Sequence, residues 1–414
     1  IPPSSLRGRI DDLPNTEQLH PGDLRGIIIC IASHTLPGYD ISSAKARVYQ
    51  ILRMLIEYGA EVHYLYYVAC ERDQKYVVDL ENLGIYVHKV ACTSEMHLKK
   101  VKEIAPDYLW ITNLWNEDRM KLNIQLINEI GNWNTDVKIV TDTMDFHAKK
   151  YYRKYEYSRD INDVLKAESF MRLEKELYAL SDSLIVVSDN ELEDMREVMD
   201  GCPPIYVIPN IHLVSSKTSS YEHRKHLAFV GNFEVNHNVD AVCWFMENAF
   251  HFISSRIPDV EFHIIGMYAE KYFKTTEGSK VKIIGFVDDV EKVLEDYKIF
   301  VCPLKYGAGM KGKLGNAICS GTPIVTTSIG AEGLKMKDGS NCFISDEAEE
   351  FAHKCVHLYQ DPVAWNNFAL KAKLVLADIA SRRTVSRQLM EVFSGWQKKK
   401  SINRCSIEHV GMSK

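Results

Sequence analysis

Short apolar runs alternate with helical stretches along most of this chain, and that alternation restricts its fold more than any other feature. Several runs are rich in β-branched residues, and apolar residues recur at helical spacing between them. Parallel strands need long crossover connections, so strands joined by helices indicate a parallel sheet. We therefore expect a doubly wound α/β sheet with strands at residues 26–32, 61–68, 108–112, 137–141, 183–187 and 205–208, and one long helix at 158–180.

The alternation restarts after a polar, serine-rich break at residues 213–220. The sequence thus predicts two Rossmann-like domains that face each other across a cleft. Further strands are expected at 227–230, 260–265, 281–284, 299–304 and 323–326. We place an arm or linker at 1–24, the N-terminal domain at 25–212, a linker at 213–225, the C-terminal domain at 226–380, and a C-terminal helix and tail at 381–414.

Length and composition favour two domains in a soluble protein. The chain has 414 residues and 46% hydrophobic content, more than one core usually holds. Its net charge of −6 argues against a general nucleic-acid binder, so any phosphate recognition must be local. The 10 cysteines include no Cys-x-x-Cys pair, which is typical of reduced core residues in a cytoplasmic protein.

The two ends of the chain carry little recognisable structure. No apolar run approaches the roughly 18 residues needed to cross a bilayer, so no transmembrane segment is expected. The chain begins with Ile1 rather than Met, which suggests processing or a piece of a longer, multidomain polypeptide. The lysine run at 398–400 is expected to be a solvated tail, and peripheral contact with an anionic membrane is the alternative.

Residues 305–325 form a glycine- and lysine-rich loop that leads into a short helix and a buried strand. The glycines let the backbone approach a ligand, and the first helical turn offers free N–H groups to phosphate. The loop follows the strand expected at 299–304, and open α/β sheets bind ligands at such carboxyl strand ends. An anion site is predicted here, with a plain βα turn as the alternative. Its central residues are Gly307, Gly309, Lys311, Gly312 and Lys313.

Together these motifs resemble the GT-B glycosyltransferases, specifically glycosyltransferase family 4, also called group 1. The resemblance runs from about residue 25 to 375. Its most specific parts are residues 229–233, 238–245, 285–290, 307–325 and 329–334, and residues 36–40, 47–49 and 141–147 in the N-terminal half are similar too.

The resemblance implies a nucleotide-diphospho-sugar donor on the C-terminal domain and a glycan acceptor on the N-terminal domain. It also implies no obligatory metal or other cofactor, and usually retention of anomeric configuration. Lysines and a helix N-terminus can stabilise a departing nucleoside diphosphate in place of a cation. The predicted donor-binding residues are Gly231, Asn232, Phe286, Val287, Gly309, Met310, Lys311, Gly312, Lys313, Asn316 and Glu332.

Two of these assignments also follow from position. Phe286 and Val287 come directly after a predicted strand, where backbone and apolar contacts suit a nucleobase. Glu332 also follows a strand end, and its carboxylate can accept hydrogen bonds from sugar or ribose hydroxyls. The alternative for Glu332 is an ordinary capping role.

His147 follows two carboxylates, Asp142 and Asp145, just past a predicted strand end. In the family a histidine here contacts the donor sugar near the reacting carbon, so we predict His147, Asp145 and Lys311 as catalytic residues. The alternative for His147 is a loop histidine that caps nearby backbone. The spacing of the two aspartates differs from that of a metal-binding DxD motif, so no metal ligands are predicted.

Acceptor-binding residues are predicted at the carboxyl end of the first strand. Gly38 would allow the acceptor or sugar close to the backbone, and Asp40 or Arg47 can bind acceptor hydroxyls or charge. The alternatives are a turn role for Asp40 and a solvated helix position for Arg47.

Ala308 and Asn316 depart from the family pattern, which usually has two glutamates eight positions apart. An amide can accept from ribose hydroxyls, but charge-assisted hydrogen bonds are about twice as strong. We expect a retaining, metal-independent glycosyltransferase in which the leaving diphosphate departs from, and the acceptor attacks, the same face of the sugar. The alternatives are a pseudoenzyme that binds a glycan or nucleotide, and a nucleotide-sugar epimerase.

Overall fold

The computed structural model describes residues 23–68, 73–112, 114–134, 136–199, 201–214 and 220–394. Several sequence expectations therefore lie outside the described residues. They are most of the arm at 1–24, the middle of the linker at 213–225, and the tail from 395 onward with its lysine run.

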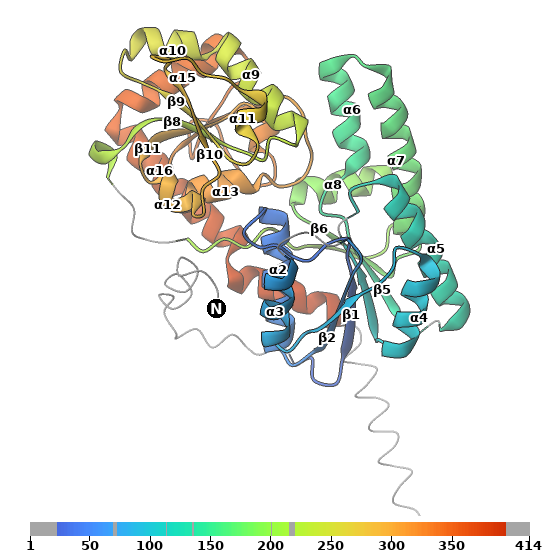
Figure 1. Cartoon of the computed structure of the whole chain (residues 1–414). Helices are drawn as coiled ribbons and strands as arrows, with labels where there is room; N and C mark the ends of the chain where they lie inside the picture. The colour runs from blue at the N-terminus through green and yellow to red at the C-terminus, as the bar shows by residue number, and fades with distance from the viewer. Residues whose placement is uncertain are drawn as a thin grey trace, which may run out of the picture.

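The first sheet is entirely parallel and has the strand order β3-β2-β1-β4-β5-β6-β7 (Figure 1). Cys30 in the central strand pairs with His63 on one side and Leu109 on the other. The strands are β1 (Ile28–Ala32), β2 (Glu61–Tyr66), β3 (Tyr86–Lys89), β4 (Tyr108–Ile111), β5 (Lys138–Asp142), β6 (Ser183–Val186) and β7 (Ile205–Val207). The helices are α2 (Ser43–Glu57), α3 (Asp73–Asn82), α4 (Ser94–Ile104), α5 (Glu117–Trp133), α6 (His147–Ser158), α7 (Ile161–Ala179) and α8 (Asp189–Val198).

The second sheet is also parallel, with the order β10-β9-β8-β11-β12-β13. Its strands are β8 (Lys225–Val230), β9 (Phe262–Ile265), β10 (Val281–Gly285), β11 (Tyr297–Cys302), β12 (Ile324–Thr326) and β13 (Phe343–Ile344). The helices are η1 (Tyr221–His223), α9 (Asn236–Asn248), α10 (Phe250–Arg256), α11 (Ala269–Tyr272), α12 (Val290–Leu294), α13 (Gly312–Cys319), α14 (Ser328–Ala331), α15 (Ala348–Gln360) and α16 (Pro362–Ala380). Two doubly wound parallel sheets are therefore confirmed.

Each sheet has its own apolar core, and the last described helix joins the core of the first sheet. A helix at residues 382–394 follows α16 and returns to the N-terminal sheet. Its Val385, Leu389 and Phe393 are fully buried there, and the Phe393 ring centroid lies 4.9 Å from that of Tyr108. This packing ties residues 382–394 to the N-terminal domain.

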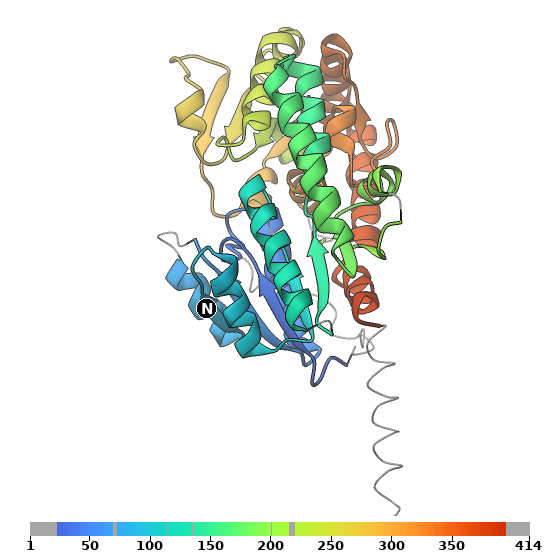
Figure 2. The same ribbon diagram turned by 90° about the vertical axis from the view of Figure 1, so that its right-hand side faces the viewer.

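One predicted helix is in fact part of a helical hairpin. The helix expected at 158–180 corresponds to α7. Helix α6 precedes it, and the short turn that joins the two helices contains Arg159 in the left-handed backbone region (φ 58°). Both views show this pair extending from the N-terminal domain along the side of the C-terminal domain (Figures 1 and 2). The hairpin therefore gives the N-terminal domain a second contact with its neighbour, away from the connecting chain.

Among the helices that the structure describes, none combines the length and the apolar character required to cross a membrane.

Candidate functional site

A cleft of about 610 Å³ lies between the two domains and is lined by residues of both. It includes most of the residues predicted from sequence: Asp40, Arg47, Asp145, His147, Gly231, Asn232, Phe286, Val287, Met310, Lys311, Gly312, Lys313 and Asn316. Gly38, Gly309 and Glu332 do not line it. The two sheets thus bring residues more than 250 positions apart in the chain to one site.

Lys311 lies in the loop between β11 and α13, and its ammonium group folds back onto that loop. Its Nζ donates to the carbonyls of Ala308 (2.9 Å) and Gly309 (2.7 Å), and the residue is only 7% exposed. Burial lowers the pKa of Lys311, and the negative charges of Glu332 and Asp145 oppose this shift. The loop therefore holds a buried cation at the edge of the cleft.

Lys313, in the first turn of α13, is the second cation at the cleft. Its Nζ donates to Oδ1 of Asn238 and lies 4.3 Å from the centroid of the Phe229 ring. Burial lowers the pKa of Lys313 to about 8. Asn316 lies one turn further along the same helix and also lines the cleft.

The charge of Lys313 should make donor affinity depend on pH. Above about pH 8 the side chain loses its proton, so affinity for a diphosphate should fall several-fold between pH 7 and 9. Because the folded pKa is below 10.5, the protonated form costs stability below about pH 8, and that cost fades as pH rises toward 10.5. Titrating UDP at several pH values checks the predicted fall in affinity, which should be absent in Lys313→Met. An equal fall in the variant would contradict the assignment.

Glycines recur at every third position through this loop and helix, and each faces a residue outside the C-terminal sheet. A Cβ added at Gly309 would lie 2.0 Å from Oδ1 of Asp145, and one at Gly312 would lie 2.0 Å from Oγ of Ser43. A Cβ at Gly315 would lie 2.2 Å from the ring of His212. These contacts leave no room for a side chain. The glycines therefore allow the loop between β11 and α13, the predicted anion loop, and the start of α13 to pack directly against the N-terminal domain and the connecting chain.

His147 is the first residue of α6, at the carboxyl end of β5. The residue is 6% exposed, and its ring centroid lies 5.2 Å from that of Phe170. Burial lowers the pKa of His147 to about 3, with Lys150 adding to the shift, while a hydrogen bond to the backbone of Leu114 opposes it. The imidazole is therefore neutral at physiological pH.

Asp145 lies beside His147 in a strained loop, since the preceding Met144 has a φ of 60°. Burial raises the pKa of the Asp145 carboxyl, while Lys150 and Lys311 lower it. Its Oδ1 is the atom against which Gly309 packs. The loop after β5 thus contacts the anion loop of the other domain directly.

Two buried glutamates that sequence reasoning missed hold this loop in place. Glu174 accepts from the backbone N–H groups of His147 (2.8 Å) and Ala148 (3.1 Å), which fixes the start of α6. Glu191 accepts from the Thr143 hydroxyl (3.2 Å) and the Val187 N–H (3.0 Å). Burial raises the pKa of Glu174 to about 8 and that of Glu191 to about 7, although these hydrogen bonds oppose the shifts.

The predicted acceptor residues have partners within their own domain. Asp40 accepts from Lys75 (2.7 Å) and from the Tyr76 hydroxyl. Burial raises the pKa of the Asp40 carboxyl, but these two hydrogen bonds and the charge of Lys75 outweigh it, so the pKa is lowered. Arg47 donates to Asp142 and to the Ile208 carbonyl, both at 2.8 Å. The side chains of the Arg47 and Asp142 pair are 0% and 1% exposed.

The third predicted acceptor residue, Gly38, packs against its own loop. A Cβ at this position would lie 2.7 Å from Cδ1 of Ile41. A role for Gly38, Asp40 and Arg47 in acceptor binding stays a prediction.

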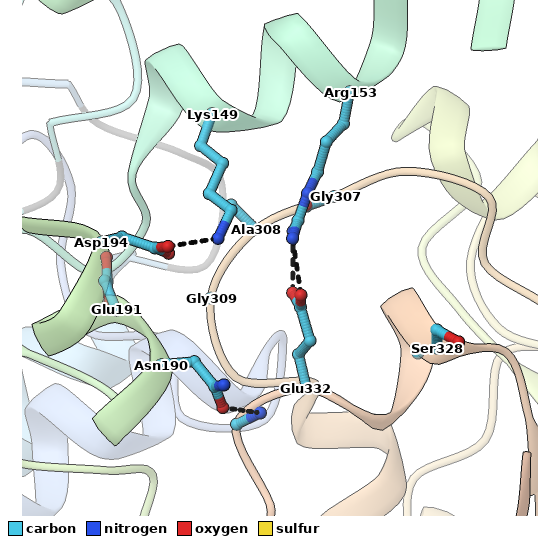
Figure 3. Close-up of polar contacts among 12 residues, drawn as sticks. Lys149, Arg153, Asn190, Glu191, Asp194, Gly307, Ala308, Gly309, Ser328 and Glu332 are labelled. Carbon is cyan, nitrogen blue, oxygen red and sulfur yellow. Dashed lines mark hydrogen bonds and ion pairs between the residues drawn. The ribbon is translucent and has the colours of Figure 1, made fainter. Parts of the chain in front are cut away.

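Arg153 on α6 reaches across to the C-terminal domain (Figure 3). Its guanidinium donates to the two carboxylate oxygens of Glu332 at 2.7 and 2.5 Å, and to the Gly307 carbonyl at 2.8 Å. Beside this pair, Oδ1 of Asn190 accepts from the N–H of Gly333 at 3.3 Å. Glu332 is thus engaged by the other domain, and its predicted role in donor binding stays a prediction.

We expect Arg153→Met to shift the protein toward a more open arrangement of its domains. The side chains of Arg153 and Glu332 are 15% and 24% exposed, so their ion pair should contribute near the upper end of the range for surface pairs, about 1 kcal/mol. Its loss should therefore change the ratio of the two domain arrangements about fivefold. Small-angle scattering should then show a larger radius of gyration. Lys149→Met is the matched control, because Lys149 pairs with Asp194 inside the N-terminal domain (Figure 3). An equal change in both variants would contradict this prediction.

Two histidines in the cleft were also missed. His237 and His212 both line it, and neither Nδ1 of His237 nor Nε2 of His212 has a hydrogen-bond partner in the described structure. Burial lowers the pKa of His212 to about 4 and that of His237 well below its usual value. Neither lies in a spacing pattern that points to chemistry, so no sequence signal identified them.

Among the residues that the structure describes, two groups of side chains have the composition of a metal site. His212, Glu291 and Cys319 bring their potential ligand atoms within 4.8 Å of one another, as do His226, Glu261 and His263. In the second group, Nδ1 of His226 accepts the Glu261 N–H at 3.1 Å. The neutral ring then carries its proton on Nε2, which opposes metal binding there. Metal independence of the main site stays a prediction.

Comparison with known proteins relates this architecture to glycosyltransferases. Residues 224–361 match the sequence model of the family "Glycosyl transferases group 1". An uncharacterized 44.6 kDa protein in the cps region of Klebsiella pneumoniae is 23% identical over 214 residues, which cover 49% of this chain and 54% of that protein. The chain therefore matches only about half the length of this relative.

Solved structures resemble the chain over nearly its whole length. Sucrose-phosphate synthase from Thermosynechococcus elongatus has a TM-score of 0.66 at 11% identity, covering 90% of this chain and all of that one (100%). HepE from Anabaena, in complex with UDP-glucose, has a TM-score of 0.65 at 13% identity, with coverages of 89% and 100%. The GT-B fold expected from the sequence is thereby confirmed.

Proposed function

We propose that the chain moves a sugar from a nucleotide-diphospho-sugar to a hydroxyl of a glycan, because residues 224–361 match the sequence model of the group 1 glycosyl transferases. We further propose that the transfer retains anomeric configuration and needs no metal ion. One observation carries the proposal: Lys311, Lys313 and the start of α13 meet His147 and Asp145 across a single cleft.

The donor diphosphate belongs at the loop between β11 and α13. The first N–H groups of α13 and the two lysines supply positive potential where negative charge develops as the diphosphate leaves. On donor binding, Lys311 would exchange the carbonyls of Ala308 and Gly309 for phosphate oxygens. The nucleobase belongs beside Phe286, which is 46% exposed and lines the cleft.

The sugar then lies between this loop and His147. A neutral imidazole with one ring nitrogen on the backbone of Leu114 keeps the other for a sugar hydroxyl. In the reaction the bond from the anomeric carbon to the diphosphate oxygen breaks, and a bond to the acceptor oxygen forms on the same face. The acceptor proton passes to the departing diphosphate.

The direct test is ligand-observed NMR with a panel of UDP-, GDP-, ADP- and dTDP-sugars. UDP-glucose comes first because the Anabaena neighbour was solved with it. The proposal expects selective binding of one nucleotide class and slow release of free sugar, with the anomer released first reporting retention. A folded sample that binds none of the panel would overturn it.

Asn316→Glu separates the enzyme from a pseudoenzyme, the alternative that Ala308 and Asn316 raise. An active wild type that the added carboxylate weakens would exclude the pseudoenzyme. Activity that appears only in the variant would support it.

A further inference from the structure

Arg119, in the first turn of α5, is a buried cation without a carboxylate partner in the described structure. It is 8% exposed, and its Nε and Nη1 atoms have no hydrogen-bond partner there. Its Nη2 lies 3.3 Å from Nε2 of His34. Burial lowers the pKa of Arg119 to about 10, and among the described residues no acidic side chain opposes this shift.

The packing around Arg119 offsets only part of the free-energy cost of burying its charge. Its guanidinium carbon lies 3.9 Å from the centroid of the Tyr67 ring, in a cation–π contact. Such a contact is weaker than the cost of removing an ion from water, and buried guanidinium groups are normally paired with anions. Arg119 therefore has unused capacity to bind an anion.

The position of Arg119 connects it to the acceptor half of the cleft. His34, Tyr67 and Trp115 follow β1, β2 and β4, which are adjacent parallel strands, so all three lie at one carboxyl edge of the N-terminal sheet. The Trp115 ring centroid lies 6.0 Å from the Arg119 guanidinium carbon. Trp115 also lines the cleft and is 52% exposed. An exposed aromatic ring of the cleft lining thus lies close to the buried cation.

The electrostatics of this corner favour an anion. Burial, Arg119 and Lys45 together lower the pKa of His34 to about 4, so its imidazole is neutral and the charged groups around it are positive. Arg47, which lines the same cleft as Trp115, is already paired with Asp142. Of the two arginines, Arg119 is the one whose charge is not compensated.

We propose that Arg119 binds an anionic group of the acceptor glycan, a carboxylate or a phosphate, while the adjoining sugar ring packs against Trp115. The identity of the ligand as an acceptor rests on the proposed function; the anion site itself rests on Arg119 and its surroundings. Trp115 turns aside to admit the anion, which its exposure allows.

Glucose, glucuronic acid and glucose 6-phosphate are suitable probes, because they share one ring and differ in the group at C6. Titration by ligand-observed NMR should show that wild type prefers one acidic sugar over glucose by about 10- to 100-fold, the range expected for a charged hydrogen bond. The two acidic sugars distinguish carboxylate from phosphate. Arg119→Met should bind all three sugars equally weakly.

Lys121→Met is the matched control, since it removes the same charge from an exposed position on the same helix (54% exposed side chain). It should keep the preference of the wild type. Equal binding of the three sugars by wild type, no binding of any, or a preference that survives in Arg119→Met would overturn the inference.

Thermal stability distinguishes a binding residue from a structural one. Removing an unpaired buried charge should leave the Tm of Arg119→Met unchanged or higher, whereas loss of a structural arginine would lower it by several degrees and count against the inference. Donor binding by Arg119→Met should equal that of wild type. A wild type that binds donor but shows no acid preference refutes only this inference. An acid preference without any donor binding refutes only the proposed function.

Discussion

Replacing Lys311 by methionine is expected to lower both donor hydrolysis and transfer by about 10²- to 10³-fold in kcat, the usual effect of removing one group that stabilises developing negative charge. Lys311 is the buried cation of the anion loop, and methionine preserves most of its volume while removing the charge. The effect should appear in kcat more than in KM, because the interaction strengthens as the diphosphate leaves. Initial rates of nucleotide release measure it.

Lys305→Met is the matched control for this prediction. Lys305 lies near the start of the same loop, but its Nζ lies 4.3 Å from the centroid of the Trp244 ring and donates to the Asp346 carbonyl instead. The control should keep near wild-type rates. A Lys311→Met enzyme as active as the control would place the diphosphate elsewhere.

The largest effect on stability is expected from Arg47→Met, which should lower the free energy of unfolding by about 3–5 kcal/mol. The variant leaves the Asp142 carboxylate buried without its ion pair and leaves the Ile208 carbonyl without its donor. Urea unfolding followed by circular dichroism measures the loss.

The double variant Arg47→Met, Asp142→Asn provides the control, because it removes both charges. It should recover much of the lost stability, since an uncharged pair avoids the buried, unpaired ion. Wild-type stability in Arg47→Met together with loss of acceptor binding would instead support the acceptor role predicted from sequence.

The architecture could be predicted because most of the described strands are largely buried and therefore read as continuous apolar runs. All residues of β4, β6 and β11 are buried, for example. Two strands at sheet edges lacked this signal. The ends of β3 are exposed and its middle residues only partly buried, and β13 has just two residues. Helix caps involve only neighbouring residues: Ser42 and Ser188 each accept from a backbone N–H group at the start of a helix.

The site was predictable only where its residues follow one another in sequence. The anion loop combines glycines, lysines and a helix start within one segment, so its pattern was visible. Arg47 looked like a solvated or acceptor-binding residue because its partner Asp142 lies 95 positions away. Arg119 gave no signal, because what makes it unusual is burial without a counter-charge, which depends on the packing of neighbouring strands.

The most direct test of the account is whether nucleoside diphosphate is released from a bound donor. Wild type incubated with the best-binding nucleotide sugar, without acceptor, should release nucleoside diphosphate above the buffer rate, and Lys311→Met should not. Addition of a glycan that is accepted should accelerate the release further. Tight binding of the donor with no release, with or without candidate acceptors, would contradict the account and identify the chain as a binding protein.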